Sequence, residues 1–231
     1  MFYEPDKNDH GLPHAPFKSC VVPRPIGWIS TVSRAGVTNL APFSQSNILG
    51  WDPPYVMFSA NNHFDGRRKD SVVNAEETRE FVYNMATYAL RDAVVLTSDV
   101  MDEGVDEMAK AGLTPAPCRL VKPPRVAESP IAFECRHYQT ILVPCDTPGA
   151  MNNLVIGRVI GVHIADEAIG ADGKLDVLKI RPLARMGYLD YTSVTDIFEV
   201  RPLSDADPRT VRGMSGGTAG VKAKAGSKAG R

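Results

Sequence analysis

The residues from 23 to 47 constrain the fold more than any other part of the chain, because two short β-type segments flank a turn there. The segments are residues 26–32 and 38–44, and Gly36, in the turn at 33–36, can supply the positive φ angle that tight hairpins need. Both arms carry hydroxyl and small side chains, which let a backbone approach a flat ligand closely. We therefore predict a β-hairpin that forms one wall of a binding site as well as part of the core.

The rest of the chain carries more strand signals than helix signals. Apolar runs rich in β-branched or aromatic residues predict strands at 55–60, 81–85, 131–143, 154–165 and 177–183. Helix signals are found at 72–77, 90–97 and 105–111. Many strands separated by turn signals, with few helices, predict a mainly β fold, an antiparallel β-barrel with a few peripheral helices, rather than a doubly wound sheet.

Three connecting segments are predicted between these elements. Residues 47–50 lead into a rigid turn at 51–54, where two prolines follow an aspartate. Residues 114–130 are rich in proline and form a surface excursion whose short extended piece is at 120–121. Residues 144–151 join the two longest strands.

Composition and charge exclude several classes of protein. The chain is 43% hydrophobic and 23% charged, with a formal net charge of −1, which is ordinary for a globular protein that buries a core. All four charged residues after residue 213 are basic, so the body before them is acidic, and nucleic-acid binding is not expected. The chain shows neither a secretory leader pattern nor a run of ~20 apolar residues, so we expect a cytoplasmic protein that does not span a membrane.

Three segments are predicted along the chain. Residues 1–19 form an N-terminal arm, residues 20–203 form one domain, and residues 204–231 form a low-complexity basic tail that cannot bury apolar surface. His10 and His14 stand four residues apart, but a glycine and a proline between them oppose the helix that would align them as metal ligands. The four cysteines lack metal-site or dithiol spacing, so we expect reduced thiols and no metal site.

Several blocks of sequence, in order along the chain, resemble those of one known family. They are residues 23–31, Gly36, 39–44, 52–59, 67–71 and 80–84, with weaker matches at 129–135 and 154–159. Together they resemble the flavin-reductase-like family, the FMN-binding split-barrel flavoproteins, from about residue 21 to about residue 191. The resemblance implies an FMN-binding split barrel of the antiparallel Greek-key type.

The phosphate of FMN requires positive or polarised donors, and one segment offers several. Charged side chains meet a predicted helix N-terminus there, and the residues concerned are Arg68, Lys69, Asp70 and Ser71. In the family that the chain resembles, the matching Lys-Asp-Ser segment contacts the flavin phosphate. The hydroxyls of Ser30 and Thr31 are further candidate donors. The alternative is that residues 67–69 form a solvated basic turn.

The flavin ring requires a flat wall and directed hydrogen bonds. The segment Ala41, Pro42, Phe43 and Ser44 is suited to main-chain hydrogen bonds with the pyrimidine end of the ring, and in related proteins the flavin edge lies along this backbone. Trp28 is a candidate for stacking on the ring, although a tryptophan in a strand is more often part of the core. Asn47 is a further candidate partner, and Asn39 is expected to hold the turn.

No protein group is predicted to be catalytic. His63, His137 and His163 are isolated in the sequence, and no nucleophile stands beside a base. A bound flavin performs hydride and electron transfer without a protein nucleophile. The chain lacks a Gly-x-Gly-x-x-Gly fingerprint, so NADH or NADPH, as a co-substrate, would have to enter the flavin cleft itself.

The chain departs from the family pattern at residues 150–152. Many flavin reductases carry Gly-Asp-His before the late strand, whereas this chain has Ala-Met-Asn. This substitution, with residues 182–191, favours the flavoredoxin-like branch, which keeps FMN bound. We therefore hold two hypotheses: an FMN oxidoreductase that passes electrons from NAD(P)H to free flavin, a metal complex or an oxygenase partner, and an FMN electron carrier that another protein reduces. A split barrel with another planar ligand is a third, and the family implies a homodimer with FMN near its interface.

Overall fold

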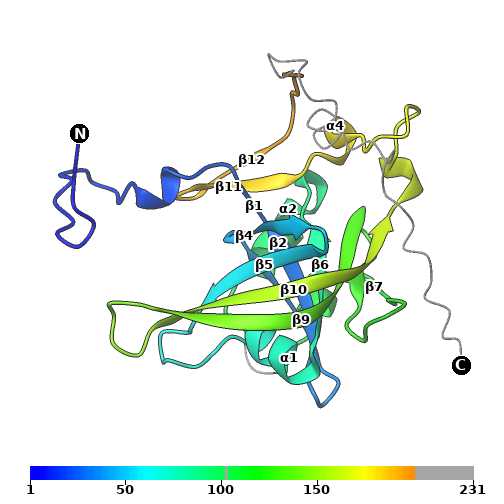
Figure 1. Cartoon of the computed structure of the whole chain (residues 1–231), viewed down its shortest axis with the longest axis horizontal. Coiled ribbons are helices and arrows are strands. Elements are labelled where there is room, and N and C mark those ends of the chain that lie inside the picture. Colours follow the sequence, from blue (N-terminus) through cyan, green and yellow to red (C-terminus); the bar gives the residue numbers. More distant parts are fainter. Residues whose placement is uncertain (102–103, 201–231) are drawn as a thin grey trace, which may run out of the picture. The chain divides into compact units, whose positions relative to one another are not determined.

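The computed structural model describes residues 1–101 and 104–200. The chain divides into two compact units, residues 1–195 and residues 196–231, and every helix and strand described below belongs to the first unit (Figure 1). The predicted tail, residues 204–231, falls outside the described part of the chain. Among the described residues, no helix is long and apolar enough to span a membrane.

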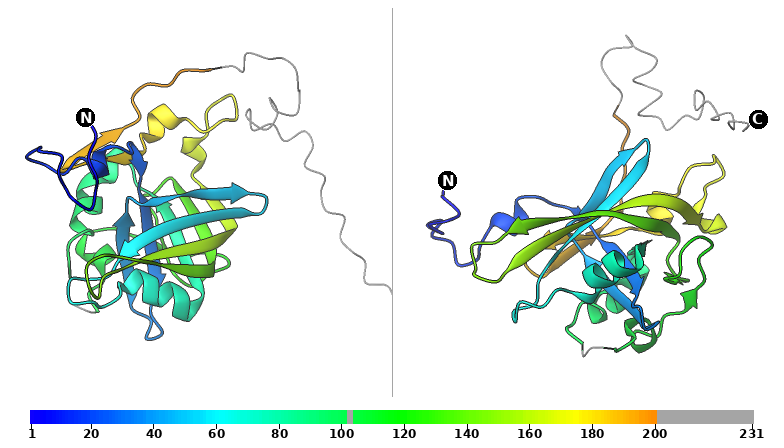
Figure 2. Two further views of the ribbon diagram at one scale, coloured as in Figure 1. Left: turned by 60° about the vertical axis from the view of Figure 1, so that its left-hand side comes forward. Right: turned by 60° about the horizontal axis from the view of Figure 1, so that its bottom comes forward.

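The main sheet contains seven antiparallel strands in the order β3-β2-β6-β9-β10-β5-β4. The strands are β2 (Gly27–Val32), β3 (Thr38–Phe43), β4 (Ser46–Trp51), β5 (Pro54–Asn61), β6 (Glu80–Met85), β9 (Ile131–Pro144) and β10 (Met151–Ile164). Strands far apart in the sequence lie side by side, because β6 pairs with β2 on one side and with β9 on the other (Figures 1 and 2). The arrangement confirms the prediction of a mainly β, antiparallel fold.

The remaining elements are short. One small sheet contains β1 (Arg24–Pro25), β11 (Leu183–Gly187) and β12 (Asp190–Ser193). Another contains β7 (Pro115–Ala116) and β8 (Arg125–Val126). The α-helices are α1 (Asp70–Thr78), α2 (Arg91–Leu96), α3 (Glu107–Lys110) and α4 (Val177–Ile180). Single 3-10 turns are η1 (Phe17–Ser19), η2 (Tyr88–Leu90) and η3 (Asp166–Ala168). The residues before η1 run outward from the sheet in Figure 1 and form no helix or strand.

The predicted hairpin forms as β2 and β3, with Gly27 opposite Phe43 and Val32 opposite Thr38. Gly36 has a φ of 86°, the conformation that the turn requires. Gly27 is required for a different reason, since a Cβ atom there would lie 2.6 Å from the ring of Tyr83. The hairpin is thus held by backbone pairing and by close packing against β6.

Two cores lie on opposite faces of this hairpin, because successive side chains of a strand point to opposite sides. Ile29 packs with the aromatic rings of Phe58 and Phe81 and with the buried side of α1. Trp28 packs on the other face with Leu40 and with residues of α2 and α3. Both Trp28 and Ile29 are fully buried, so the hairpin lies at the centre of the unit.

Three of the predicted segments are wrong. Residues 177–180 form α4 in place of a strand, because the Asp176 carboxylate caps the helix by accepting a hydrogen bond from the Lys179 amide at 3.0 Å, and only Leu183 of the predicted segment is in a strand, β11. Residues 47–50 belong to β4, which pairs with β5. The predicted extended piece at 120–121 joins no sheet, since the amides of Leu120 and Val121 donate to the Glu134 carboxylate instead.

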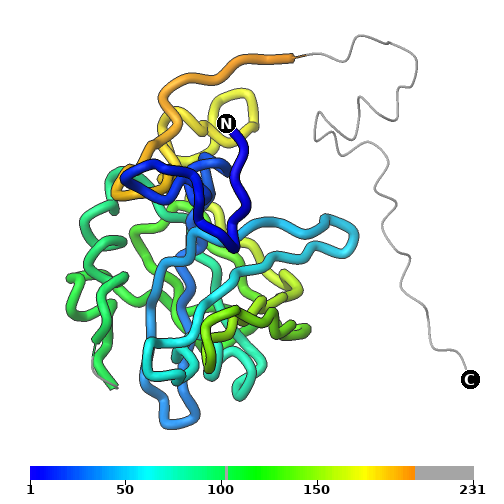
Figure 3. Tube along the Cα trace, turned by 90° about the vertical axis from the view of Figure 1, so that its left-hand side faces the viewer, coloured from blue at the N-terminus to red at the C-terminus, as the bar shows by residue number. Residues whose placement is uncertain are grey.

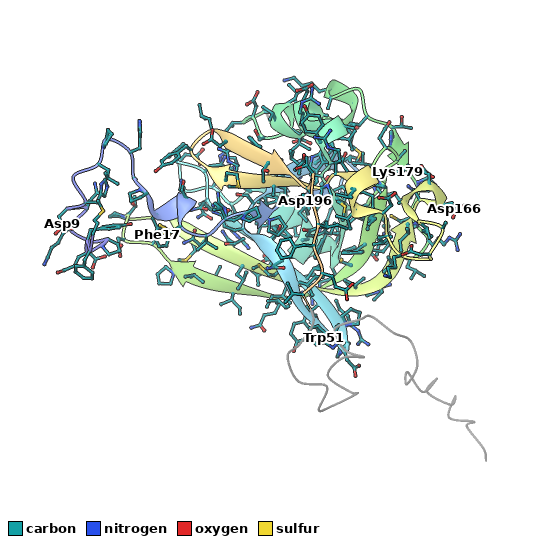
Figure 4. The ribbon with its side chains drawn as sticks, turned by 90° about the horizontal axis from the view of Figure 1, so that it is seen from above. Asp9, Phe17, Trp51, Asp166, Lys179 and Asp196 are labelled. Carbon is teal, nitrogen blue, oxygen red and sulfur yellow. The ribbon has the colours of Figure 1, made fainter. Side chains whose placement is uncertain are left out.

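The hairpin of β4 and β5 projects from the rest of the first unit (Figure 3). Trp51 lies at its far end and is 88% exposed (Figure 4). Further large apolar side chains are exposed on the same strand, at Ile48 and Leu49, and on β9, at Leu142 and Val143. β5 and β10 lie between these two strands in the sheet, so the exposed side chains form two separate groups, one on β4 and one on β9. Exposed apolar groups of this kind are typical of contact surfaces.

Candidate functional site

A cavity of about 250 Å³ lies where β3, the end of β5, the start of α1 and the segment after α2 come together. Seven of the twelve candidate flavin-binding residues line it. They are Ala41, Pro42, Phe43, Ser44, Lys69, Asp70 and Ser71. The fold therefore brings the predicted ring segment and most of the predicted phosphate segment to the same cavity.

One wall of the cavity is the outer edge of β3, which is the terminal strand of its sheet and pairs with no other strand of the described residues on that side. The amide of Leu40 points outward and donates to Glu107 Oε2 at 2.9 Å. Pro42 is two residues further along and faces the same edge. The N–H that a proline lacks is therefore not needed for pairing with β2. The wall continues at Gln45, whose carbonyl accepts a hydrogen bond from the Ser59 amide at 2.8 Å.

Positive charge gathers at another side of the cavity. His63, Arg67 and Lys69 all line it, and the Arg67 guanidinium pairs with Asp65 at 2.7 Å. Lys69 is the residue from which α1 begins. The amides in the first turn of a helix have no partner within the helix, so those of Asp70 and Ser71 add to the positive potential. Burial lowers the pKa of His63, and the charges of Lys69 and Arg67 lower it further. This side of the cavity is suited to an anion.

Arg68 does not line this cavity, although its neighbours Arg67 and Lys69 do. Its guanidinium forms an ion pair with Glu76 at 2.6 Å, and its Nε atom donates to Asn153 Oδ1 at 3.3 Å. Arg68 lines a second cavity of about 610 Å³ between α1 and the β9–β10 hairpin. The side chain thus faces away from the site that the sequence assigned to it, and Glu76 already balances its charge.

Trp28 also lies outside the cavity. Its ring is fully buried in the core, and its indole Nε1 donates to Thr97 Oγ1 at 2.9 Å. Thr97 is the residue that ends α2, and it lines the cavity itself. Trp28 therefore contacts a wall of the site from behind.

The other three candidates make structural hydrogen bonds elsewhere. Ser30 donates to the Pro124 carbonyl at 2.5 Å. Thr31 accepts from the Asn74 side chain at 3.1 Å, which ties β2 to α1. The Asn47 side chain is on β4 and accepts from the next backbone amide. None of the three lines the cavity.

A polar network connects the walls of the cavity. The Ser71 hydroxyl lies 2.8 Å from the side-chain amide of Asn39, and that amide reaches Glu107 Oε1 at 3.3 Å when its nitrogen faces the carboxylate. Glu107 also accepts the Leu40 amide, so it links α3 to the edge of β3. Burial raises the pKa of Glu107, and the nearby Asp70 and Asp106 add to this effect.

Several lining residues were not among the sequence candidates, chiefly His63, Arg67, Thr97 and Glu107. A local signal existed for the first two, since residues 61–66 form a polar loop that runs into the basic cluster. No local signal identifies Thr97 and Glu107, because they reach the site from more than 50 residues beyond β3. Only the packing of α2 and α3 against the hairpin brings them there.

A separate cluster contains three potential metal ligands, since the ligand atoms of Cys118, Glu134 and His163 lie within 4.8 Å of one another. Both oxygens of Glu134 are already occupied, by three backbone amides of residues 119–121 and by His163 Nε2 at 2.5 Å. Burial raises the pKa of Cys118 to about 11, which favours the neutral thiol. The carboxylate therefore anchors a loop, and the cluster needs no ion to satisfy it.

Comparison with known proteins identifies the family. Residues 19–184 match the family described as "Flavin reductase like domain". The chain belongs to the flavin-reductase-like family. Among its relatives is an uncharacterized protein from Aquifex aeolicus (strain VF5), 36% identical over 167 residues, which span 72% of this chain and 82% of the relative. The uncharacterized protein YwrF from Bacillus subtilis (strain 168) is 30% identical over 184 residues, which span 79% and 89%.

Solved structures agree with this membership. Component B of nitrilotriacetate monooxygenase from Bacillus cereus has a TM-score of 0.79 and 26% identity, covering 87% of this chain and 98% of its own. Flavoredoxin of Desulfovibrio vulgaris has a TM-score of 0.67 at 21% identity, covering 81% and 94%, and indicates the fold alone. The split-barrel fold that the sequence predicted is thereby confirmed, and the family supports a flavin cofactor.

The residues of the cavity fit such a group. FMN has a dianionic phosphate and a flat ring with hydrogen-bonding edges, and the cavity has a cationic side next to an open strand edge. The cationic side thus suits the phosphate, and the wall at Pro42 to Ser44 suits the flat ring.

Proposed function

We propose that this protein is an FMN-dependent oxidoreductase that transfers electrons from NADH or NADPH, through FMN, to free flavin, a metal complex or an oxygenase partner. One observation carries the proposal: two segments about 30 residues apart in sequence meet at one cavity with a cationic side and an open strand edge, in a chain of the flavin-reductase-like family.

In this proposal, Lys69 holds the phosphate together with the first-turn amides of α1, and Arg67, which also pairs with Asp65, lies beside them. The backbone from Pro42 to Ser44 orients the ring along the edge of β3. FMN bound there would supply the chemistry of hydride and electron transfer, for which the protein needs no nucleophile. The task of the chain is to bind the cofactor, fix its orientation and leave one side open to a second substrate.

An oxygenase partner is supported by one similar structure. The Bacillus cereus protein, which is 26% identical to this chain, is named as component B of a monooxygenase. By analogy, the present chain would supply reduced flavin to a separate oxygenase. The oxygenase would then accelerate the oxidation of NAD(P)H by this protein only when the substrate of the oxygenase is present.

An electron carrier that another protein reduces is the second candidate function. Asn152 occupies the place where many flavin reductases carry a histidine, and in the β5–β10 pairing it lies opposite Asn61, which lines the cavity. An amide cannot change its charge as a histidine does. This substitution beside the cavity favours reduction by a protein donor over reduction by nicotinamide.

The absorbance spectrum of the purified protein, recorded under anaerobic conditions before and after NADH and then NADPH, tests both functions. A flavin band that bleaches within the first seconds supports the oxidoreductase and identifies its donor. A band that persists with either nucleotide, but bleaches with dithionite, supports the carrier. Protein that stays colourless and fails to quench FMN fluorescence would overturn both.

We also propose that the protein is a homodimer. The exposed apolar side chains of β4, at Ile48, Leu49 and Trp51, and of β9, at Leu142 and Val143, would be covered by a second copy. Light scattering after size exclusion should then give twice the chain mass. The variant Trp51→Glu should shift the protein towards monomer, whereas a monomeric native protein would contradict the proposal.

A further inference from the structure

A groove of about 540 Å³ adjoins the candidate flavin cavity. Three residues, Pro42, Ser44 and Ser98, line both spaces. Two of these belong to the segment that we propose holds the flavin ring. The groove therefore opens beside the ring position, where a second substrate would have to lie.

The walls of this groove are mostly apolar. Ile26 and Val94 are buried at its base, while Val95 and Leu189 are exposed at its rim, at 46% and 87%. An exposed apolar side chain gains most when a flat apolar molecule covers it. The walls thus favour an uncharged ring.

Arg185 is the only residue of the groove lining that carries a formal charge. Its guanidinium carbon lies 4.4 Å from the centre of the Tyr191 ring, and its Nη2 atom donates to the Tyr188 carbonyl. These contacts orient the guanidinium but leave its charge unbalanced, because in residues 1–101 and 104–200 no carboxylate pairs with it. A planar, oriented guanidinium binds a carboxylate through two parallel hydrogen bonds.

We propose that this groove is a subsite for a small electron acceptor, additional to those named above, and that it takes a flat apolar ring bearing one carboxylate. Arg185 binds the carboxylate, and the ring lies against Pro42 and Val94. The proposal rests on the proposed function, because the shared wall at Pro42 is what would bring this ring next to the flavin. A nicotinamide dinucleotide carries two or more phosphates, for which a single guanidinium is a poor match.

The test is calorimetric titration of the FMN-loaded protein with benzoate and with its neutral counterpart, benzamide. Benzoate should bind at one site, and Arg185→Gln should weaken it by about tenfold or more, the cost of a lost charge-assisted hydrogen bond. Benzamide should bind more weakly than benzoate and should not respond to the substitution. Arg185→Lys, which keeps the charge but loses the planar fork, should give an intermediate affinity.

Arg91→Gln is the matched control, since Arg91 stacks on Tyr88 at the same distance of 4.4 Å but does not line the groove. It should leave benzoate binding unchanged. Equal affinity for benzoate and benzamide, or an unchanged affinity in Arg185→Gln, would overturn the subsite. So would an Arg185→Gln variant that raises the KM for NADH or NADPH while benzoate binding stays native.

FMN affinity, measured by fluorescence quenching in the same variants, separates this proposal from the proposed function. Arg185→Gln should bind FMN as the native protein does, because Arg185 lies outside the flavin cavity. Native protein that binds FMN but not benzoate refutes the subsite alone. Native protein that binds no FMN refutes the proposed function, and the subsite with it.

Discussion

The indole Nε1 of Trp28 donates a hydrogen bond to Thr97 Oγ1 at 2.9 Å, across 69 residues of sequence. It joins the centre of the β2–β3 hairpin to the end of α2, and Thr97 lines the candidate flavin cavity. A fully buried tryptophan thus positions part of the site without lining it. The wall formed by residues 97–101 depends on the core behind it.

The variant Trp28→Phe tests that dependence. It keeps an aromatic ring but removes the indole N–H, so we expect the free energy of unfolding to fall by about 1–3 kcal/mol, from the lost bond and the smaller ring. FMN affinity should fall severalfold as Thr97 loses its partner. Urea denaturation and flavin fluorescence titration measure the two effects. Trp51→Phe, at an exposed tryptophan, is the control, and equal behaviour of the two variants would contradict the prediction.

Lys69 and Arg68 should differ in their effect on cofactor binding, although they are adjacent. Lys69→Gln removes a charge that lines the cavity and should weaken FMN by about 1.5–3 kcal/mol, the range for a hydrogen bond to a charged group. Arg68→Gln breaks the pair with Glu76 and should change mainly the free energy of unfolding. Fluorescence titration of both variants decides the matter, and a larger loss of affinity in Arg68→Gln would restore the original assignment.

The pKa of His63 should report the phosphate directly. Burial and the charges of Lys69 and Arg67 lower this pKa in the free protein. A phosphate bound beside Lys69 would offset those charges, so the pKa of His63 should rise on FMN binding, and FMN should bind more tightly as the pH falls towards 6. NMR titration of the His63 ring measures the shift. Riboflavin lacks the phosphate and should leave the pKa low, and an equal rise with riboflavin would refute the anion site.

The carboxyl of Glu107 should make stability depend on pH. Burial raises its pKa above the ordinary 4.5, so the folded protein retains this proton at pH values where the unfolded chain has lost it. Its contribution to stability is therefore complete below about pH 4.5 and declines as the pH rises through the folded pKa. Glu107→Gln keeps an oxygen to accept the Leu40 amide but cannot ionise.

Relative to the native protein, Glu107→Gln should thus become more stable as the pH rises from 4 to 7. Urea denaturation at several pH values gives the difference in unfolding free energy. Asp106→Asn is the control: it removes a carboxyl at the exposed, neighbouring N-cap of α3 but keeps an oxygen that can cap the helix. A pH-independent difference for Glu107→Gln would show that its carboxyl titrates normally in the folded state.

Local sequence patterns were sufficient for much of the fold. The hairpin around Gly36 and the strands paired as β9 and β10 follow from alternation and turn residues within a few positions. The helix expected over 72–77 forms as α1, but it begins at Asp70, and its N-cap, Lys69, makes no side-chain hydrogen bond. The same local blocks carried the resemblance to the flavin-reductase-like family, which the match over residues 19–184 then established. The side chains near these blocks, such as Pro42 and Lys69, were accordingly found at one cavity.

Tertiary structure decided which neighbouring side chains face the site. Arg68 and Lys69 have the same charge, but only Lys69 lines the flavin cavity. Contacts with Glu76 and Asn153 hold the Arg68 side chain at the second cavity, between α1 and the β9–β10 hairpin. Trp28 is in the predicted strand, but its ring packs in the core with Leu40, on the face of the hairpin that α2 and α3 cover. α4 replaces a predicted strand because Asp176 caps the helix. Glu107 reaches the cavity only by packing against the edge of β3.

The physical reason is the range of the interactions. Turn chemistry, capping and alternation act over a few residues, so the sequence alone determined the hairpin, most strands and the family. The direction of a side chain depends on partners such as Thr97 for Trp28, 69 residues away, and no local pattern encodes such a partner. The sequence therefore identified the two segments that meet, and only the tertiary structure decided which of their side chains line the cavity.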